Sequence, residues 1–96
     1  MPGTLRGTAS WVRPSLGSRY LAMRLPRGTH VRICGPLACV TRTVVDWGPN
    51  RRIHPGRIAD LSRRDFARVC GDPSMGVCGV RARVVGGIGL PETDAP

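Results

Sequence analysis

The chain has 96 residues, 41% hydrophobic and 4% aromatic, which allows one small domain with an aliphatic core and excludes two separate cores. Thirteen glycines and nine prolines favour many turns and short strands over long helices. All fifteen basic residues are arginine and six residues are acidic, so the formal net charge is +9. Such a charge favours an anionic partner, which could be a cell-wall polymer, a nucleic acid or an acidic protein surface.

The arginines are spread from Arg6 to Arg83, and they form no continuous basic stripe and no alternation with aromatic residues. We therefore expect an arginine-coated surface and no specific nucleic-acid partner. No run of about 18 apolar residues occurs, so we expect no membrane span. The first six residues lack an apolar signal core. We expect an extracellular or cell-envelope protein whose signal has been removed, or a component of a virion.

The first half of the chain predicts strands. Small and apolar residues alternate over Thr4–Val12, which predicts the first strand, and a turn-rich loop follows. Tyr20–Met23 is expected to be a short strand. The clearest pattern is a hairpin formed by Thr29–Cys34 and Cys39–Asp46, because valine, isoleucine and threonine dominate both segments.

The second half predicts the single helix. A basic loop at 49–56 leads to a short strand, Arg57–Ala59, which ends at Asp60. Ser62 and Asp65 form a Ser-x-x-acid signature, which predicts a helix from this point to about residue 69 with its apolar face on the sheet. Alternating valines and arginines predict a final strand over Val77–Val85. We therefore expect one domain over residues 1–85 and a flexible C-terminal tail over 86–96.

Four cysteines form two local pairs, Cys34 with Cys39 and Cys70 with Cys78. Four cysteines allow three pairings, and sequence alone does not choose among them. A hairpin places flanking cysteines at bridging distance, which favours the Cys34–Cys39 bridge, and the second pair would fix a loop. A zinc site with four thiolates is the alternative, but the spacings do not fit a common zinc knuckle. We favour disulfides and an oxidising compartment, with no metal site and no cofactor.

Four short blocks occur in a fixed order along the chain: Gly7–Trp11 (GTASW), Leu25–Ile33 (LPRGTHVRI), Asp46–Pro49 (DWGP) and Gly56–Ser62 (GRIADLS). Together they resemble the signatures of the RlpA-like double-psi β-barrel family, over roughly residues 7–85. The resemblance implies an all-β fold, a six-stranded double-psi β-barrel with one short helix. It also implies binding of peptidoglycan glycan strands, with cleavage of the lytic transglycosylase type as a further expectation.

The resemblance implies catalytic roles for two aspartates. Asp60 would be the general acid that protonates the glycosidic oxygen, and one carboxyl group can act as acid and then as base. Asp46 would position a sugar hydroxyl or support the second carboxylate. The structural alternatives are that Asp60 caps the helix or binds loop amides, and that Asp46 forms an Asx turn.

Four further residues are candidates for substrate binding. Trp47 would stack on a sugar ring, although it could instead cover the barrel end, and Trp11 is expected to pack against the barrel. Arg51, Arg52 and Arg57 would line the groove and attract an anionic glycan.

Two observations oppose catalysis. The family segment between the first two blocks carries a glutamate and a histidine, whereas Val12–Arg24 has neither, and Ala22-Met23 stands in place of the histidine. In addition, Arg57, Arg63 and Arg64 flank Asp60 in sequence, and nearby positive charge favours an ionised carboxylate. His30 and His54 are expected to be exposed. The alternative function is a non-catalytic glycan-binding or structural barrel, for example in a phage tail, with other virion or cell-envelope proteins as partners. A charge-driven nucleic-acid binder is a second alternative.

Overall fold

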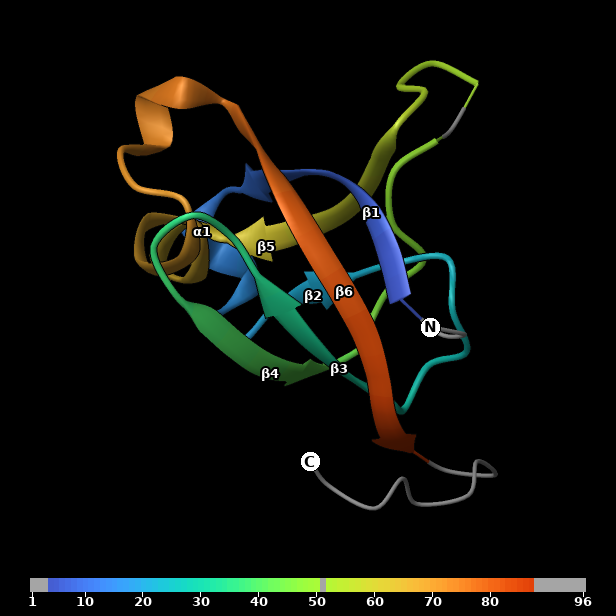
Figure 1. Cartoon of the computed structure of the whole chain (residues 1–96). Coiled ribbons are helices and arrows are strands. Elements are labelled where there is room, and N and C mark those ends of the chain that lie inside the picture. Colours follow the sequence, from blue (N-terminus) through green and yellow to red (C-terminus); the bar gives the residue numbers. More distant parts are fainter. Residues whose placement is uncertain (1–3, 51, 88–96) are drawn as a thin grey trace.

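The computed structural model describes residues 4–50 and 52–87, and the elements follow the chain as six strands, one helix and two 3-10 turns (Figure 1). Their bounds are β1 Thr4–Val12, η1 Pro14–Leu16, β2 Leu21–Ala22, β3 Thr29–Cys34, β4 Cys39–Thr43, β5 Arg57–Ser62, α1 Arg63–Val69, η2 Pro73–Met75 and β6 Val77–Gly87. No helix in the described part of the chain has the length and apolar character needed to cross a bilayer.

The strands form one curved sheet in the order β2-β5-β1-β6-β3-β4. The β1–β5 pair is parallel, and the other named pairs are antiparallel. The segment after β4 returns to β2, where the Val45 amide donates to the Leu21 carbonyl at 3.0 Å and the Met23 amide donates to the Asp46 carbonyl at 3.1 Å. These bonds join the two edges of the sheet, so the described residues form a nearly closed six-stranded barrel.

Aliphatic side chains fill the barrel, as the low aromatic content predicted. Val31, Ile33 and Leu61 are fully buried, and they come from strands on different sides of the barrel. Along β6, Val80 and Ala82 point inward while Arg81 and Arg83 are exposed, so the predicted alternation is confirmed. The strand period of two therefore sets which face of each strand enters the core.

Helix α1 closes one end of the barrel. The Ser62 hydroxyl accepts a hydrogen bond from the Asp65 amide at 3.0 Å, so the predicted N-cap is confirmed. The Asp65 carboxylate does not complete a capping box; it receives two hydrogen bonds from Arg42, at 2.8 and 2.9 Å. Phe66 and Val69 are fully buried against the barrel. The helix is thus fixed both by its apolar face and by an ion pair to β4.

Four predicted boundaries were wrong. Strand β4 ends at Thr43 and not at Asp46, because the chain leaves β3 there to pair with β2. Strand β5 continues through Ser62, so Asp60 lies inside a strand and not at its end. The short second strand contains two residues and not four, and β6 includes two residues of the predicted tail, through Gly87. The rest of that tail, 88–96, lies outside the described residues.

Both preferred disulfides are present. Cys34 is bonded to Cys39, and these residues are directly paired across the β3–β4 hairpin. Cys70 is bonded to Cys78, so the end of α1 is tied to the start of β6. Because all four thiols are used, the alternative of a four-cysteine zinc site is wrong.

Candidate functional site

The two aspartates lie on either side of strand β2, at the seam where the barrel closes. Ala22 pairs with Asp60 of β5 on one side, and it forms a parallel bridge to Asp46 on the other. Two strand spacings separate the backbones of the two aspartates, which amounts to about 10 Å. Asp46 and Asp60 are separated by the loop at 49–56, and the closure of the sheet brings them to either side of Ala22. We call this surface the carboxylate seam, defined by Ser10, Tyr20, Asp46, Trp47 and Asp60.

Asp60 is half-buried in the middle of β5. Its neighbour across the parallel β1–β5 pair is Ser10, whose hydroxyl donates a hydrogen bond to the Asp60 carboxylate. The cap of helix α1 is Ser62, so the interpretation of Asp60 as a helix cap is wrong. The side chain is held by a strand, which positions it more rigidly than a loop would.

Asp46 is exposed and ionised. Its carboxylate accepts hydrogen bonds from the Trp47 amide at 2.8 Å and from the Tyr20 hydroxyl at 3.0 Å. The Trp47 amide is the main cause of a lowered pKa of this carboxyl, and the Tyr20 hydroxyl adds to the effect. Arg27 lies 4.0 Å away and contributes a weaker attraction. Asp46 is therefore suited to accept hydrogen bonds and unsuited to donate a proton.

Tyr20, which was not among the predicted site residues, donates its hydroxyl to Asp46. Partial burial, the hydrogen bond to Asp46 and the charges of Asp46 and Asp60 together raise the pKa of Tyr20 to about 12. Both carboxylates thus act on one hydroxyl, which stays protonated at neutral pH. The available signal was composition, because Tyr20 is the single tyrosine of the chain and directly precedes the predicted second strand.

Trp47 stands at the edge of the seam with 52% of its surface exposed, so part of its ring is free to contact a ligand. Its ring is approached by the Arg24 guanidinium at 5.6 Å, and Arg24 also donates to the Pro49 carbonyl at 3.2 Å. The turn that presents Trp47 depends on Gly48, which has φ +91. A Cβ at Gly48 would lie 2.8 Å from the Met23 Cα, so the turn packs directly against the strand at the seam.

The three arginines predicted to line the groove do not lie together on one element. Arg57 lies on β5, half-buried and paired with Thr8, and its Nε has no hydrogen-bond partner among the described residues. Arg52 is exposed in the loop before β5. Arg51 lies outside the described residues. Whether these arginines contact a ligand stays a prediction.

The arginines that follow Asp60 in sequence do not pair with it. Arg63 stacks on the Trp11 ring at 5.5 Å. Trp11 packs against the core, as expected, and its indole donates to the Pro73 carbonyl at 2.7 Å. The described residues contain two ion pairs, Arg27–Asp46 and Arg42–Asp65, so the objection that arginines surround Asp60 loses its main support.

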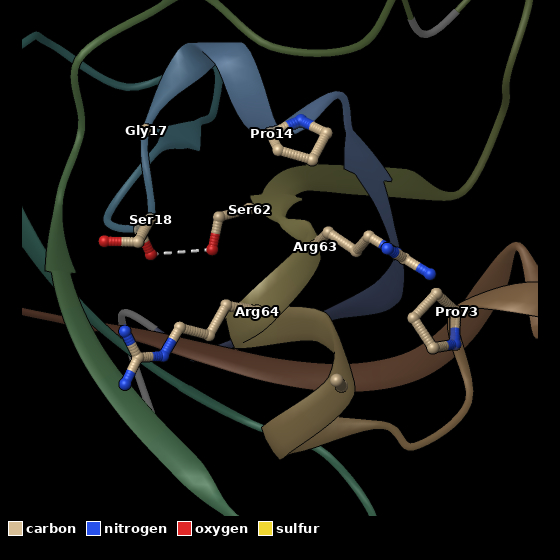
Figure 2. A pocket seen from close by; sticks show the side chains of 8 residues that line it. Pro14, Gly17, Ser18, Ser62, Arg63, Arg64 and Pro73 are labelled. Atoms are coloured by element: carbon tan, nitrogen blue, oxygen red, sulfur yellow. Dashed lines mark hydrogen bonds between the residues drawn. The ribbon is translucent and has the colours of Figure 1, made fainter.

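A hollow of about 460 Å³ lies beside the seam, between η1, α1 and η2 (Figure 2). Ser62 donates to the Ser18 carbonyl at 2.7 Å on one wall, and Arg63 and Arg64 extend on opposite sides. Neither aspartate lines this hollow. Asp46 is exposed and Asp60 is half-buried, so the carboxylates are not enclosed in this hollow.

His30 and His54 are both exposed, as expected, and His30 is hydrogen-bonded to Thr43 at 2.8 Å. Residues 4–50 and 52–87 contain no group of three histidine, cysteine or carboxylate side chains that could hold a metal ion.

Comparison with known proteins identifies the fold. The structure is similar to that of apo expansin from Clavibacter michiganensis, with a TM-score of 0.69 and 20% sequence identity. It is also similar to an aspartate-to-asparagine mutant of the same expansin in complex with cellohexaose, with a TM-score of 0.65 and 20% identity. Each match covers 97% of this chain and 53% of the expansin chain, so this protein spans about half the length of those proteins.

The sequence matches no known protein family and no curated protein. The structural matches confirm the predicted fold, a six-stranded double-psi β-barrel with one short helix. The narrower assignment to the RlpA-like family stays a prediction.

Proposed function

We propose that this protein binds a cell-wall glycan along the carboxylate seam. The observation that carries the proposal is the placement of Asp46 and Asp60 on either side of Ala22, with the Tyr20 hydroxyl hydrogen-bonded to Asp46. Carboxylates and a hydroxyl can hydrogen-bond the hydroxyl groups of a sugar, and the exposed Trp47 ring at the edge can stack on the sugar face. The expansin complex with cellohexaose supports this proposal, because a similar barrel occurs there in a protein that holds a linear glycan.

The polymer that we propose is peptidoglycan, in keeping with the RlpA-like blocks in the sequence. A protein with this role would act outside the cytoplasm, in the cell envelope or on a virion, and its two disulfides are compatible with either place. A non-catalytic barrel that attaches a phage tail or another envelope protein to the wall would use the same seam.

Cleavage of the lytic transglycosylase type is the second candidate, and the position of Asp60 favours it. Asp60 is half-buried, fixed by β5 and oriented by Ser10, so it is the better placed acid, whereas Asp46 is held ionised. Protonated Asp60 would give its proton to the glycosidic oxygen as the bond to C1 breaks. The muramoyl 6-hydroxyl would then attack C1 and return a proton to Asp60, which leaves an anhydro sugar and the regenerated acid.

Binding is tested by titrating soluble peptidoglycan strands and cellohexaose into the wild type, Trp47→Ala and Ile53→Ala. Ile53 is a matched control, because it is exposed by 68% in the loop that follows the seam. We expect Trp47→Ala to weaken glycan binding about tenfold, the usual effect of removing an aromatic contact, and Ile53→Ala to have little effect. Equal affinities of all three proteins for both glycans would overturn the proposed seam.

Cleavage is tested separately by incubating denuded peptidoglycan strands with the protein and searching for anhydro-sugar ends by mass spectrometry. Products made by the wild type and lost in Asp60→Asn would establish the enzyme. If the wild type binds the strands but produces no anhydro ends, the non-catalytic alternative holds. Asp60→Asn should then change only the affinity for the strands.

A further inference from the structure

A second surface of the barrel is strongly basic, and the described residues form no ion pair with its arginines. Four exposed arginines, Arg6, Arg32, Arg81 and Arg83, lie on the outer face of three adjacent strands, β1, β6 and β3. We call this surface the arginine face. In the sheet order, β5 and β1 lie between β2 and β6. The arginine face therefore lies across the barrel from the carboxylate seam, and Figure 1 shows β6 in front of β2.

The register of the sheet brings the four side chains into a compact group. Arg6 is directly opposite Arg81 across β1–β6, and Arg32 is directly opposite Arg83 across β3–β6. Arg81 and Arg83 are two residues apart on one strand, which corresponds to about 7 Å. Two like-charged pairs in direct cross-strand contact destabilise a sheet, so the folded barrel holds this arrangement at a cost.

Within residues 4–50 and 52–87, none of these four arginines forms an ion pair. The two ion pairs there engage other arginines, Arg27 and Arg42. Strands β1, β3, β4 and β6 contain no acidic residue. The surface is also grooved: one hollow of about 370 Å³ is lined by Arg32, Arg81 and Arg83. A second hollow of about 400 Å³ adjoins it and shares Arg81 and Cys34.

From this arrangement we propose that the arginine face binds an anionic wall polymer whose charges are phosphodiester groups in its backbone. The planar guanidinium fork matches two oxygens of a phosphate, and arginine is the side chain best suited to such bidentate contacts. The face offers charge along a groove but no aromatic surface for a sugar ring, because Trp11, Tyr20, Trp47 and Phe66 all lie elsewhere. Recognition there depends on the charges of the polymer backbone.

The same absence of stacking side chains disfavours a single-stranded nucleic acid, which binds through aromatic platforms as well as through charge. The choice of a wall polymer over duplex DNA rests on the proposed glycan function of the seam. With both surfaces occupied, the barrel would contact a glycan strand on one side and a phosphate-bearing polymer on the other.

The test measures binding to purified bacterial walls that carry a polyol-phosphate polymer and to the same walls after hydrofluoric acid has removed it. The wild type, Arg81→Gln/Arg83→Gln and the control Arg13→Gln/Arg68→Gln are compared over a range of salt concentrations. The control residues are exposed and lie on neither surface, and both double variants lose the same charge. A cellohexaose titration of each protein reports separately on the seam.

We expect the wild type to bind intact walls more tightly than stripped walls. The variant Arg81→Gln/Arg83→Gln should lose about tenfold in affinity for intact walls, and its slope of log affinity against log salt should fall by about 1 to 2. The control should stay close to the wild type, and cellohexaose binding should be equal in all three proteins. If the wild type bound neither cellohexaose nor stripped walls, the seam proposal would fail, and the difference between intact and stripped walls would still test the arginine face.

The proposal is overturned if stripped and intact walls bind equally, or if both double variants lose the same affinity. Displacement of the protein from walls by duplex DNA at a lower concentration than by the free polyol-phosphate polymer would assign the face to nucleic acid. Retained binding to polygalacturonate with none to the phosphate polymer would assign it to carboxylates. Either result contradicts the phosphodiester proposal.

Discussion

The carboxylate seam and the arginine face lie on one small barrel but are built in different ways. At the seam each charged group has a partner: Ser10 donates to Asp60, and Tyr20 and the Trp47 amide donate to Asp46. On the arginine face, the described residues supply no carboxylate for any of four guanidinium groups. The seam is therefore preorganised for directional hydrogen bonds, and the face attracts any dense negative charge in its groove.

This contrast shows why net charge alone was a poor guide to function. The charge of +9 predicted an anionic partner, but it did not indicate where the charge is concentrated. Arginines that are distant in sequence meet on the arginine face because β1, β6 and β3 are adjacent. The residues proposed to bind a glycan, in contrast, include two of the six acidic residues and two of the four aromatic residues of the chain.

The largest expected effect is the difference in stability between replacing an arginine that is paired with a carboxylate and replacing one that is not. Arg42→Gln removes the partner of Asp65, whose side chain is 3% exposed, and leaves a buried charge unpaired. We expect the free energy of unfolding to fall by about 4 kcal/mol. Arg32→Gln on the neighbouring strand removes no described ion pair and should change stability by less than about 1 kcal/mol. Urea unfolding measures both, and similar losses would refute the distinction between paired and unpaired arginines.

The seam can be broken without touching a charge. Gly48→Ala combines an unfavourable φ of +91 with a Cβ 2.8 Å from the Met23 Cα. We expect a loss of stability of about 3 kcal/mol and a displaced Trp47, hence weaker glycan binding. Gly56→Ala is the matched control, because φ is +88 and no atom lies within 4 Å of its Cβ. The control should lose about 1 kcal/mol from the backbone alone. Equal losses in thermal unfolding would show that the close packing at the seam is unimportant.

The electrostatics of the seam can be read from one chromophore. Tyr20 is the single tyrosine, so the change in near-ultraviolet absorbance on phenol ionisation reports one group. We expect its midpoint at about 12, because the folded state raises the pKa of Tyr20. Asp46→Asn removes a charge and should lower that midpoint toward the usual value of about 10. A midpoint unmoved by Asp46→Asn would contradict the hydrogen bond.

The sign of the linked change in stability follows from the same shift. The folded state holds the proton more tightly than the unfolded state, so the contribution of Tyr20 to stability is fully present below about pH 10. It is lost as the pH rises through the folded value of about 12. In Tyr20→Phe this part of the alkaline decline should be absent, which urea unfolding at a series of pH values can measure.

The smallest effect concerns the arginine face itself. Arg83→Gln relieves the like-charge contact with Arg32 directly across β3–β6. We expect a gain in stability of roughly 0.2–1 kcal/mol that disappears at high salt. A loss of stability at low salt would mean that Arg83 already has a neutralising partner within the protein.

Local patterns were enough to predict most of the elements. Thr4–Val12 and Thr29–Cys34 have the bounds that alternation indicated, and the capping serine Ser62 was found from its spacing to Asp65. The hairpin favoured the Cys34–Cys39 bridge, which is present. These features depend on residues close in sequence, so propensity and periodicity reveal them.

The strand boundaries around the candidate site were predicted less well, and the errors have a common cause. Strand β4 ends early and β5 continues past Asp60 because each pairs with a partner far along the chain. Tyr20 and Ser10 were missed as site residues for the same reason. Their contacts with Asp46 and Asp60 span 26 and 50 positions.

The sequence by itself determined the β-rich character, the turns, the capped helix and the two aspartates as candidates, since these follow from short-range spacing and composition. Only the tertiary structure decided that Ala22 lies between Asp60 and Asp46, and that four scattered arginines share one face. The physical reason is that strand order and register arise from packing one closed sheet around one core, which no local stretch of the chain specifies.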